Sequence, residues 1–228
     1  MQTIAERLKC AREHVAHATA DAHRPPNSVK LLAVSKTKPV SDIMAAYEAG
    51  QRCFGENYIQ EGVEKVKELS DLRDIEWHMI GPIQSNKTKA VAEHFDWVQT
   101  VDREKIARRL NDQRPEGLPP LNVCIQVNID DEDSKSGVSP TELAPLVAFI
   151  GDLPNLTLRG IMAIPKANPS VKEQEATLTV LKELFDQYHT SLSNFDTLSV
   201  GMSSDMGQAI QCGSTMVRIG TAIFGKRA

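Results

Sequence analysis

The sequence has few cysteines, few aromatic residues and no long hydrophobic run. Its four cysteines, Cys10, Cys53, Cys124 and Cys212, lie far apart and form no CxxC pair. They are too few for a disulfide framework, and their spacing is wrong for a zinc site. No stretch approaches the roughly 18 apolar residues of a membrane-spanning helix, and the N-terminus lacks the basic start and apolar stretch of a secretory signal. We therefore expect a cytoplasmic protein with reduced thiols.

Neither sign of charge dominates the sequence. Lys and Arg number 26 and Asp and Glu number 30, a net charge of −4 in 228 residues. The chain therefore has no basic field that would attract nucleic acid or an anionic membrane, and the short clusters Lys87/Lys89 and Lys226/Arg227 fit a solvated surface. With 41% apolar and 25% charged residues, the composition is ordinary for a globular protein and excludes a disordered or fibrous chain.

What the sequence does contain is a regular alternation of short apolar runs and amphipathic stretches. Eight runs read as strands buried on both faces: 29–36, 52–57, 75–81, 97–101, 122–129, 156–164, 197–201 and 216–221. Helical periodicity fills most of the intervals. This alternation indicates a parallel sheet with right-handed crossovers. Eight units in this length predict a single α/β domain over residues 1–228, a (β/α)8 TIM barrel, with an open doubly wound sheet as the alternative.

The two ends of the chain depart from the usual barrel. Only seven residues follow Thr221, too few for a full eighth helix, whereas residues 4–18 carry a helical apolar pattern ahead of the first strand. We expect this extra N-terminal helix to cover the face of the barrel that a last helix normally covers.

Catalytic and binding residues of such barrels lie at the C-terminal ends of the strands, and the first strand ends in a lysine. Strand alternation puts Lys36 on the same face as Val34. If that face points inward, the amine rises into the barrel mouth, partly removed from water and available for Schiff-base chemistry. A lysine that reaches back to solvent is the alternative. Lys38 is a second candidate, although Pro39 favours an extended loop position for it.

The second and third strand ends are less specific. Gly55, Glu56 and Asn57 end the second strand with polar groups, and Asn57 either donates to a ligand oxygen or caps the next helix. His78 lies inside the third strand, where a histidine is more typical of a satisfied core residue than of a catalyst.

The seventh and eighth strand ends indicate an anion site. Ser203 and Ser204 precede a helical pattern that resumes at Met206, and helix N-termini offer free N–H groups to anions. Gly220 allows close approach of the backbone to a phosphate and Thr221 adds a hydroxyl; barrels often bind phosphate at these two strand ends.

An inward-facing arginine is predicted beside this anion site. Arg218 shares strand parity with Gly220, so we expect its side chain to face the barrel interior. Because its charge cannot be removed there, it needs a ligand or an ion pair, for which Glu56 and Asp205 are the candidates.

Together these residues describe a ligand. Lys36 would react with an aldehyde or ketone, and the loops after the seventh and eighth strands would bind a phosphate. Arg218 would contact a polar atom. Pyridoxal 5′-phosphate (PLP) has all three. A sugar phosphate held as a Schiff base, as in a lysine aldolase, satisfies the first two and remains an alternative.

Seven segments of the sequence resemble the pyridoxal phosphate homeostasis proteins: residues 32–39, 54–58, 77–87, 134–137, 160–163, 199–205 and 217–225. The resemblance implies a barrel similar to the N-terminal domain of bacterial alanine racemase, with Lys36 carrying PLP as a Schiff base. The remaining site residues that it implies are Ser203, Ser204, Gly220 and Thr221 at the phosphate, Arg218 at the pyridine nitrogen, Asn57 lining the site, and His78 and Met162 nearby.

The resemblance also implies a carrier or regulator of PLP without established catalysis. The chemistry agrees, because an arginine beside the pyridine nitrogen disfavours its protonation and weakens the ring as an electron sink. Racemases of this kind also take acid–base groups from a second domain and a partner chain, for which no residues remain here. We expect a monomer that passes PLP to apoenzymes, with no catalytic residue and no metal. A PLP-dependent racemase-like enzyme is the alternative, and Lys135 in the loop 130–137 is a candidate second amine.

Overall fold

Eight parallel strands form a closed barrel in sequence order, β1 to β8, with β8 pairing back onto β1. The computed structural model describes residues 2–130, 136–166 and 170–225. The strands are β1 (Lys30–Val34), β2 (Cys53–Glu56), β3 (Glu76–Met79), β4 (Trp97–Val101), β5 (Leu121–Val127), β6 (Leu156–Ala163), β7 (Thr197–Ser199) and β8 (Met216–Ile219). All eight predicted strands are present, and the predicted barrel is confirmed.

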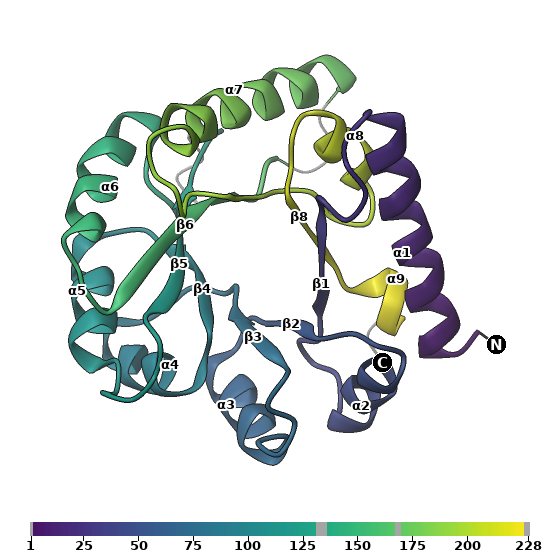
Figure 1. The fold of residues 1–228 in the computed structure, drawn as a ribbon, viewed down its shortest axis with the longest axis horizontal. Coiled ribbons are helices and arrows are strands. Elements are labelled where there is room, and N and C mark those ends of the chain that lie inside the picture. Colours follow the sequence, from purple (N-terminus) through teal and green to yellow (C-terminus); the bar gives the residue numbers. More distant parts are fainter. Residues whose placement is uncertain (1, 131–135, 167–169, 226–228) are drawn as a thin grey trace.

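Helices surround the barrel (Figure 1). They are α1 (Ile4–Asp21), α2 (Val40–Glu48), α3 (Ile59–Glu68), α4 (Thr88–His94), α5 (Glu104–Gln113), α6 (Leu143–Gly151), α7 (Val171–His189), α8 (Met206–Gln211) and α9 (Thr221–Phe224), with 3-10 turns at Ser85–Lys87 and Pro140–Glu142. The main apolar core lies between these helices and the outer faces of the strands. Among the described residues, no helix has both the length and the apolar character needed to cross a lipid bilayer.

The N-terminal helix takes the place of a full last helix. A capping box between Thr3 and Glu6 starts α1, and its buried face includes Leu8 and Val15. It packs against α8, the short α9 and α2 (Figure 1). Arg7 adds a direct link, because its Nε donates to the carbonyl of Ile223 in α9 at 2.6 Å. The expected role of the extra helix is confirmed.

Seven of the eight strands, all but β4, stop one or two residues earlier than predicted, and two of these ends concern predicted site residues. β8 ends at Ile219 rather than Thr221, because Gly220 turns the chain and serves as the N-cap of α9. β1 ends at Val34, and Thr37 then adopts a left-handed backbone with φ 62°, which is uncommon for a β-branched residue. Both differences lie at the barrel mouth, where the chain leaves the ladder to present the predicted site residues.

Candidate functional site

Lys36 lies just past the end of β1, and its two chain neighbours are held firmly. The Ser35 N–H continues the ladder to the Gly55 carbonyl at 3.0 Å, and the Ser35 hydroxyl donates to Glu56 at 2.6 Å. On the other side, the strained Thr37 donates its N–H to Glu61 at 2.6 Å. Backbone strain of this kind persists only where the surroundings enforce it. The half-buried Lys36 is therefore presented from a fixed piece of backbone.

A buried ion pair holds this backbone from the outer side of the barrel. The ammonium of Lys65 on α3 contacts Glu56 at 2.8 Å, Glu61 at 2.6 Å and the Ser35 carbonyl at 2.8 Å. Burial raises the pKa of Glu56, while Lys65 and the Ser35 hydroxyl oppose that shift. Glu56 ends β2 as predicted, but its side chain points toward α3, where it positions the lysine loop and does not pair with Arg218. Sequence reasoning missed Lys65, although it shares a helix face with Glu61 four residues away.

Arg218 lies inside the barrel at the end of β8 and is 6% exposed. Its Nη1 donates to the carbonyl and to the hydroxyl of Ser199, both at 2.8 Å, and Nη2 donates to the Ala163 carbonyl at 2.9 Å. Neither predicted carboxylate pairs with it: Glu56 pairs with Lys65, and Asp205 acts only through its longer-range charge. Of the five N–H donors of a guanidinium, the described residues satisfy three.

The charge of Arg218 survives this burial. Burial lowers its pKa to about 10, and the negative charge of Asp205 opposes the shift. The guanidinium therefore stays cationic at neutral pH inside the barrel. Two of its N–H groups are not used by the described residues.

The predicted phosphate residues lie on the loops that follow β7 and β8. Ser203 and Ser204 are exposed in the turn before α8, and exposed Thr221 is the first residue of α9. The two strand ends are joined, because the Arg218 N–H donates to the Gly201 carbonyl at 3.0 Å. Gly220 also adjoins β1: a Cβ there would lie 3.3 Å from the Val34 carbonyl oxygen, closer than most side chains tolerate. The absence of a side chain at Gly220 is what lets β8 and the Lys36 strand end come together.

Asn57 follows β2 and borders a hollow at the mouth. The hollow has a volume of about 210 Å³ and includes Asn57, Ile80, Gln126 and Ile164 in its lining. The Oδ1 atom of Asn57 is buried and has no hydrogen-bond partner among the described residues. A buried polar atom without a partner is costly in a folded protein, so it marks a place where a ligand donor fits.

A chain of polar side chains crosses the barrel interior, and sequence reasoning did not find it. The Ser199 hydroxyl donates to Gln99 Oε1 at 2.6 Å, and Gln99 Nε2 lies 2.9 Å from His78 Nδ1. His78 Nε2 lies 2.8 Å from Glu76 Oε1. Because β4 and β7 are not neighbours in the barrel, the bond between Gln99 and Ser199 passes through the interior. His78 is thus a satisfied core residue, as its position in the strand suggested.

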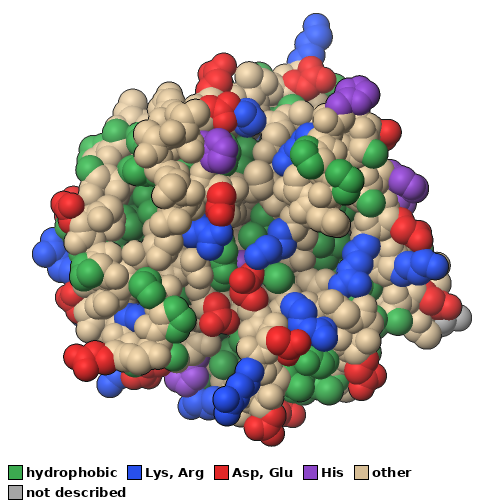
Figure 2. All heavy atoms as spheres, in the orientation of Figure 1, with side chains coloured by type: hydrophobic (Ala, Val, Ile, Leu, Met, Phe, Trp, Pro, Cys, Tyr) green, Lys and Arg blue, Asp and Glu red, His purple; other side chains and the backbone are tan. Residues whose placement is uncertain are grey.

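Charged pairs close the opposite, N-terminal end of the barrel. Lys30 contacts Glu76 at 2.9 Å and Arg159 pairs with Asp196 at 2.5 Å. Both cations also lie over the ring of Trp97, with centroid distances of 5.6 and 4.6 Å. Figure 2 shows acidic and basic side chains gathered over the centre of the molecule.

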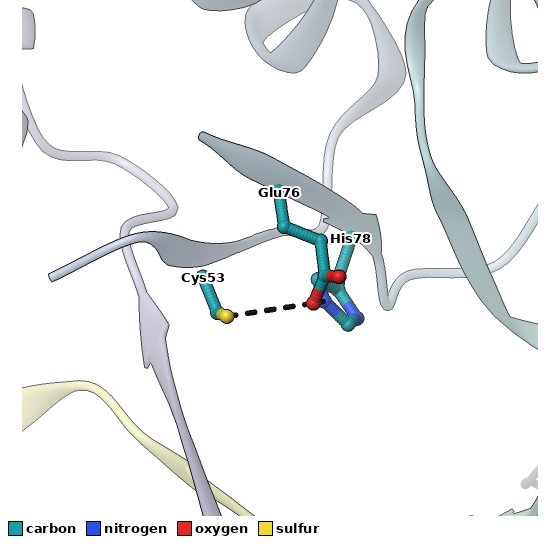
Figure 3. Close-up of side chains that lie close together, drawn as sticks. All are labelled: Cys53, Glu76 and His78. Carbon is teal, nitrogen blue, oxygen red and sulfur yellow. Dashed lines mark hydrogen bonds and ion pairs between the residues drawn. The ribbon is translucent and has the colours of Figure 1, made fainter. Parts of the chain in front are cut away.

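Three side chains at this end are of types that ligate metals (Figure 3). Cys53, Glu76 and His78 bring their donor atoms within 4.8 Å of one another. Burial and the charge of Glu76 raise the pKa of the Cys53 thiol to about 12, so the thiol keeps its proton. Glu76 is engaged with Lys30 and His78. The cluster is thus held by its own hydrogen bonds and ion pair.

Comparison with known proteins places the chain in a family. Residues 8–228 match the family model described as "Alanine racemase, N-terminal domain". The sequence is 58% identical over 228 residues to the pyridoxal phosphate homeostasis protein of Pasteurella multocida, covering 99% of this chain and 98% of that protein. The chain belongs to the pyridoxal phosphate homeostasis protein family. The resemblance seen in the sequence motifs is confirmed.

Solved structures extend the comparison for this family. PipY of Synechococcus elongatus, in a structure described as having PLP bound, is 35% identical, with a TM-score of 0.79 over 92% of this chain and 100% of that one. The alanine racemase of Corynebacterium glutamicum is 16% identical, with a TM-score of 0.66, and this chain covers 61% of it. The racemase therefore shares the barrel fold, whereas the homeostasis proteins match this chain from end to end.

Two further features of the described residues lie away from the mouth that the family motifs outline. Met162 is buried in the interior against Trp97 and Cys124. Lys135 lies outside the described residues. A hollow of about 930 Å³ lies between α1 and the N-terminal part of the barrel wall, larger than the one at the mouth but lined by none of the predicted site residues. Its three arginines are engaged: Arg12 donates to the Ala49 carbonyl, Arg24 donates to the Ile210 and Ser214 carbonyls, and Arg52 pairs with Asp74.

Proposed function

We propose that this protein binds PLP at the barrel mouth, as a Schiff base with Lys36, and serves intracellular PLP homeostasis without catalysis. The observation that carries the proposal is Arg218, a buried cation with two N–H groups not used by the described residues. It lies on β8, which pairs with β1, and Lys36 follows the end of β1. The family membership and the PLP reported in the PipY structure support the same ligand.

The residues at the mouth fit the parts of this ligand. The unpartnered Asn57 Oδ1 can accept a hydrogen bond from a protonated ligand group. Ser203, Ser204 and Thr221 offer hydroxyls to a phosphate beside Gly220, where the first N–H groups of α9 have no partner within the helix. PLP supplies an aldehyde, and the neutral amine of Lys36 attacks it to form a C=N bond with release of one water. This step needs no oxidant or reductant.

Arg218 favours a role in which the protein binds PLP without using it in catalysis. A cation facing the ring nitrogen disfavours protonation of that nitrogen, and the ring then draws electrons from a bound amino acid less strongly. To test this, the PLP-loaded protein is incubated in deuterated water with an amino acid of a single configuration. The α-proton of that amino acid should exchange with solvent no faster than it does with free PLP. Rapid exchange would instead favour a racemase-like enzyme.

The decisive experiment traps the linkage. Purified protein is incubated with PLP, its visible absorption is recorded, and borohydride reduction is followed by peptide mass spectrometry. We expect the label on Lys36, loss of the absorption band in Lys36→Ala, and an unchanged band in the neighbouring control Lys38→Ala. A label on another lysine, or a band that survives Lys36→Ala, would overturn the assignment. A wild-type protein that acquires no band would overturn PLP binding itself and leave the cofactor-free aldolase.

The proposed role has three consequences outside the site. The four cysteines are free among the described residues, which suits the reducing cytoplasm, and cell fractionation checks this location.

We propose a monomer, which light scattering after size exclusion would show. We also propose that apoenzymes receive the cofactor, so a PLP-dependent apoenzyme mixed with the loaded protein should regain activity faster than PLP release into buffer allows.

A further inference from the structure

The polar chain inside the barrel has a direction. Gln99 Nε2 lies 2.9 Å from His78 Nδ1 and 3.1 Å from the Met216 sulfur, and an amide nitrogen can only donate in both contacts. Its Oε1 then accepts the Ser199 hydroxyl proton at 2.6 Å. His78 Nδ1 therefore carries a lone pair and its Nε2 carries the proton, which is donated to Glu76 at 2.8 Å.

Arg218, Ser199, Gln99, His78 and Glu76 thus form a series of hydrogen bonds. Every donor in this series points the same way, from the mouth of the barrel to its N-terminal end. Arg218 donates to Ser199, Ser199 to Gln99, Gln99 to His78, and His78 to Glu76. Hydrogen bonds arranged in one direction polarise one another and strengthen in a low-dielectric interior. The series starts at a cation without a carboxylate partner and ends on a carboxylate.

The environment of His78 supports this orientation. The ring is fully buried and stacks on Trp97 at a centroid distance of 4.9 Å. Burial lowers its pKa, as do the nearby charges of Lys30 and Arg159, while Glu76 opposes them. A neutral imidazole with one donor and one acceptor nitrogen is the form that the series requires.

We propose that Gln99 and His78 are positioning residues for the cofactor site: through Ser199 they fix the Arg218 guanidinium and link it to the charge of Glu76. Because Gln99 Oε1 accepts the Ser199 hydroxyl proton, the lone pairs of the Ser199 hydroxyl oxygen face Arg218. This inference rests on the proposed binding of PLP, since Arg218 is the group that would meet its ring nitrogen.

The test uses Gln99→Met, which keeps the side-chain length and removes both hydrogen-bonding groups. We expect the PLP dissociation constant to rise about threefold to tenfold, as for loss of one or two buried hydrogen bonds, and the visible absorption band to shift. The matched control is Gln51→Met: Gln51 is also buried and bonded to Leu31, Cys53 and Arg12, but it lies outside the series. The Gln51→Met variant should be less stable than the wild type but keep the wild-type PLP affinity and visible absorption spectrum.

A double-mutant cycle separates positioning from simple structural support. If Gln99 acts through Arg218, Gln99→Met should change PLP affinity far less in an Arg218→Met background than in the wild type. Equal losses in both backgrounds, or equal losses for Gln99→Met and Gln51→Met, would overturn the proposal.

One arm is independent of PLP. Long-range 1H–15N spectra of the unloaded protein report the His78 tautomer, and we expect the proton on Nε2. A proton on Nδ1 would reverse the series and overturn the inference even if PLP binds. A wild-type protein that does not bind PLP, but has the Nε2 tautomer, would overturn the proposed function and leave the internal series standing.

Discussion

At the scale of single residues, the titration of the buried His78 makes stability depend on pH. Burial lowers its pKa in the folded protein, whereas the unfolded chain titrates near the ordinary value of about 6.5. Below that pH the unfolded chain binds a proton that the folded chain does not, so stability falls as pH falls. The charged groups facing the ring are Glu76, Lys30 and Arg159, and Glu76 stays ionised through this range because its contacts with His78 and Lys30 lower its pKa.

We therefore expect the unfolding free energy to decrease between pH 7.5 and 5.5, with a limiting contribution from His78 of about 1.4 kcal/mol per pH unit. In His78→Gln, whose amide can still accept from Gln99 and donate to Glu76, the decrease should be smaller. Urea unfolding at several pH values measures both. Replacing the exposed His14 by Gln should leave the His78 contribution in place. An identical pH dependence in wild type and His78→Gln would contradict the prediction.

Some site residues could be foreseen individually and others could not. The placement of Lys36 past β1 was predictable because it ends an apolar run, and the inward placement of Arg218 was predictable because it shares strand parity with Gly220. The side-chain direction of Glu56 was not foreseen, and Gln99 and Ser199 were missed, because strands buried on both faces show no polar alternation that separates inside from outside. The register also shifts between β4 and β5 and between β5 and β6, so parity counted along one strand does not carry over to the next.

At the scale of elements, α1 is the part that most distinguishes this barrel. Leu8 is fully buried between α1 and the rest of the core, so Leu8→Ala should lower the unfolding free energy by about 2–5 kcal/mol. Lys9→Ala, next to it but exposed, should change it by less than about 0.5 kcal/mol. Urea denaturation compares the two. If Leu8→Ala were as mild as Lys9→Ala, α1 would not fold as part of the barrel.

The elements were more predictable than their ends. Strand runs and the long helices carry strong apolar periodicity, so their existence followed from the sequence. The short α4 did not, because its seven residues include only three buried ones, too few for a pattern. The ends of β1 and β8 depend on Thr37 and Gly220, whose backbone angles are set by tertiary contacts rather than by the apolar run.

At the scale of the whole molecule, the two ends of the barrel have different roles. Ion pairs close the N-terminal end, whereas at the C-terminal mouth the Asn57 oxygen and two Arg218 N–H groups have no partner among the described residues. Groups left unsatisfied lower stability until a ligand meets them. Binding of PLP should therefore stabilise the folded molecule as a whole.

A ligand that binds only the folded state stabilises it by about 2.7 kcal/mol at 100 times its dissociation constant. For a chain of this length, that raises the melting temperature by several degrees. Lys36→Ala should keep only the part that comes from the phosphate and ring contacts. Pyridoxine 5′-phosphate, which lacks the aldehyde, should give wild type and Lys36→Ala the same small increase. Scanning calorimetry with PLP, pyridoxine 5′-phosphate and no ligand measures all three states. If PLP and pyridoxine 5′-phosphate raised the wild-type melting temperature equally, the covalent link to Lys36 would contribute nothing, and the mouth would bind PLP through its phosphate and ring alone.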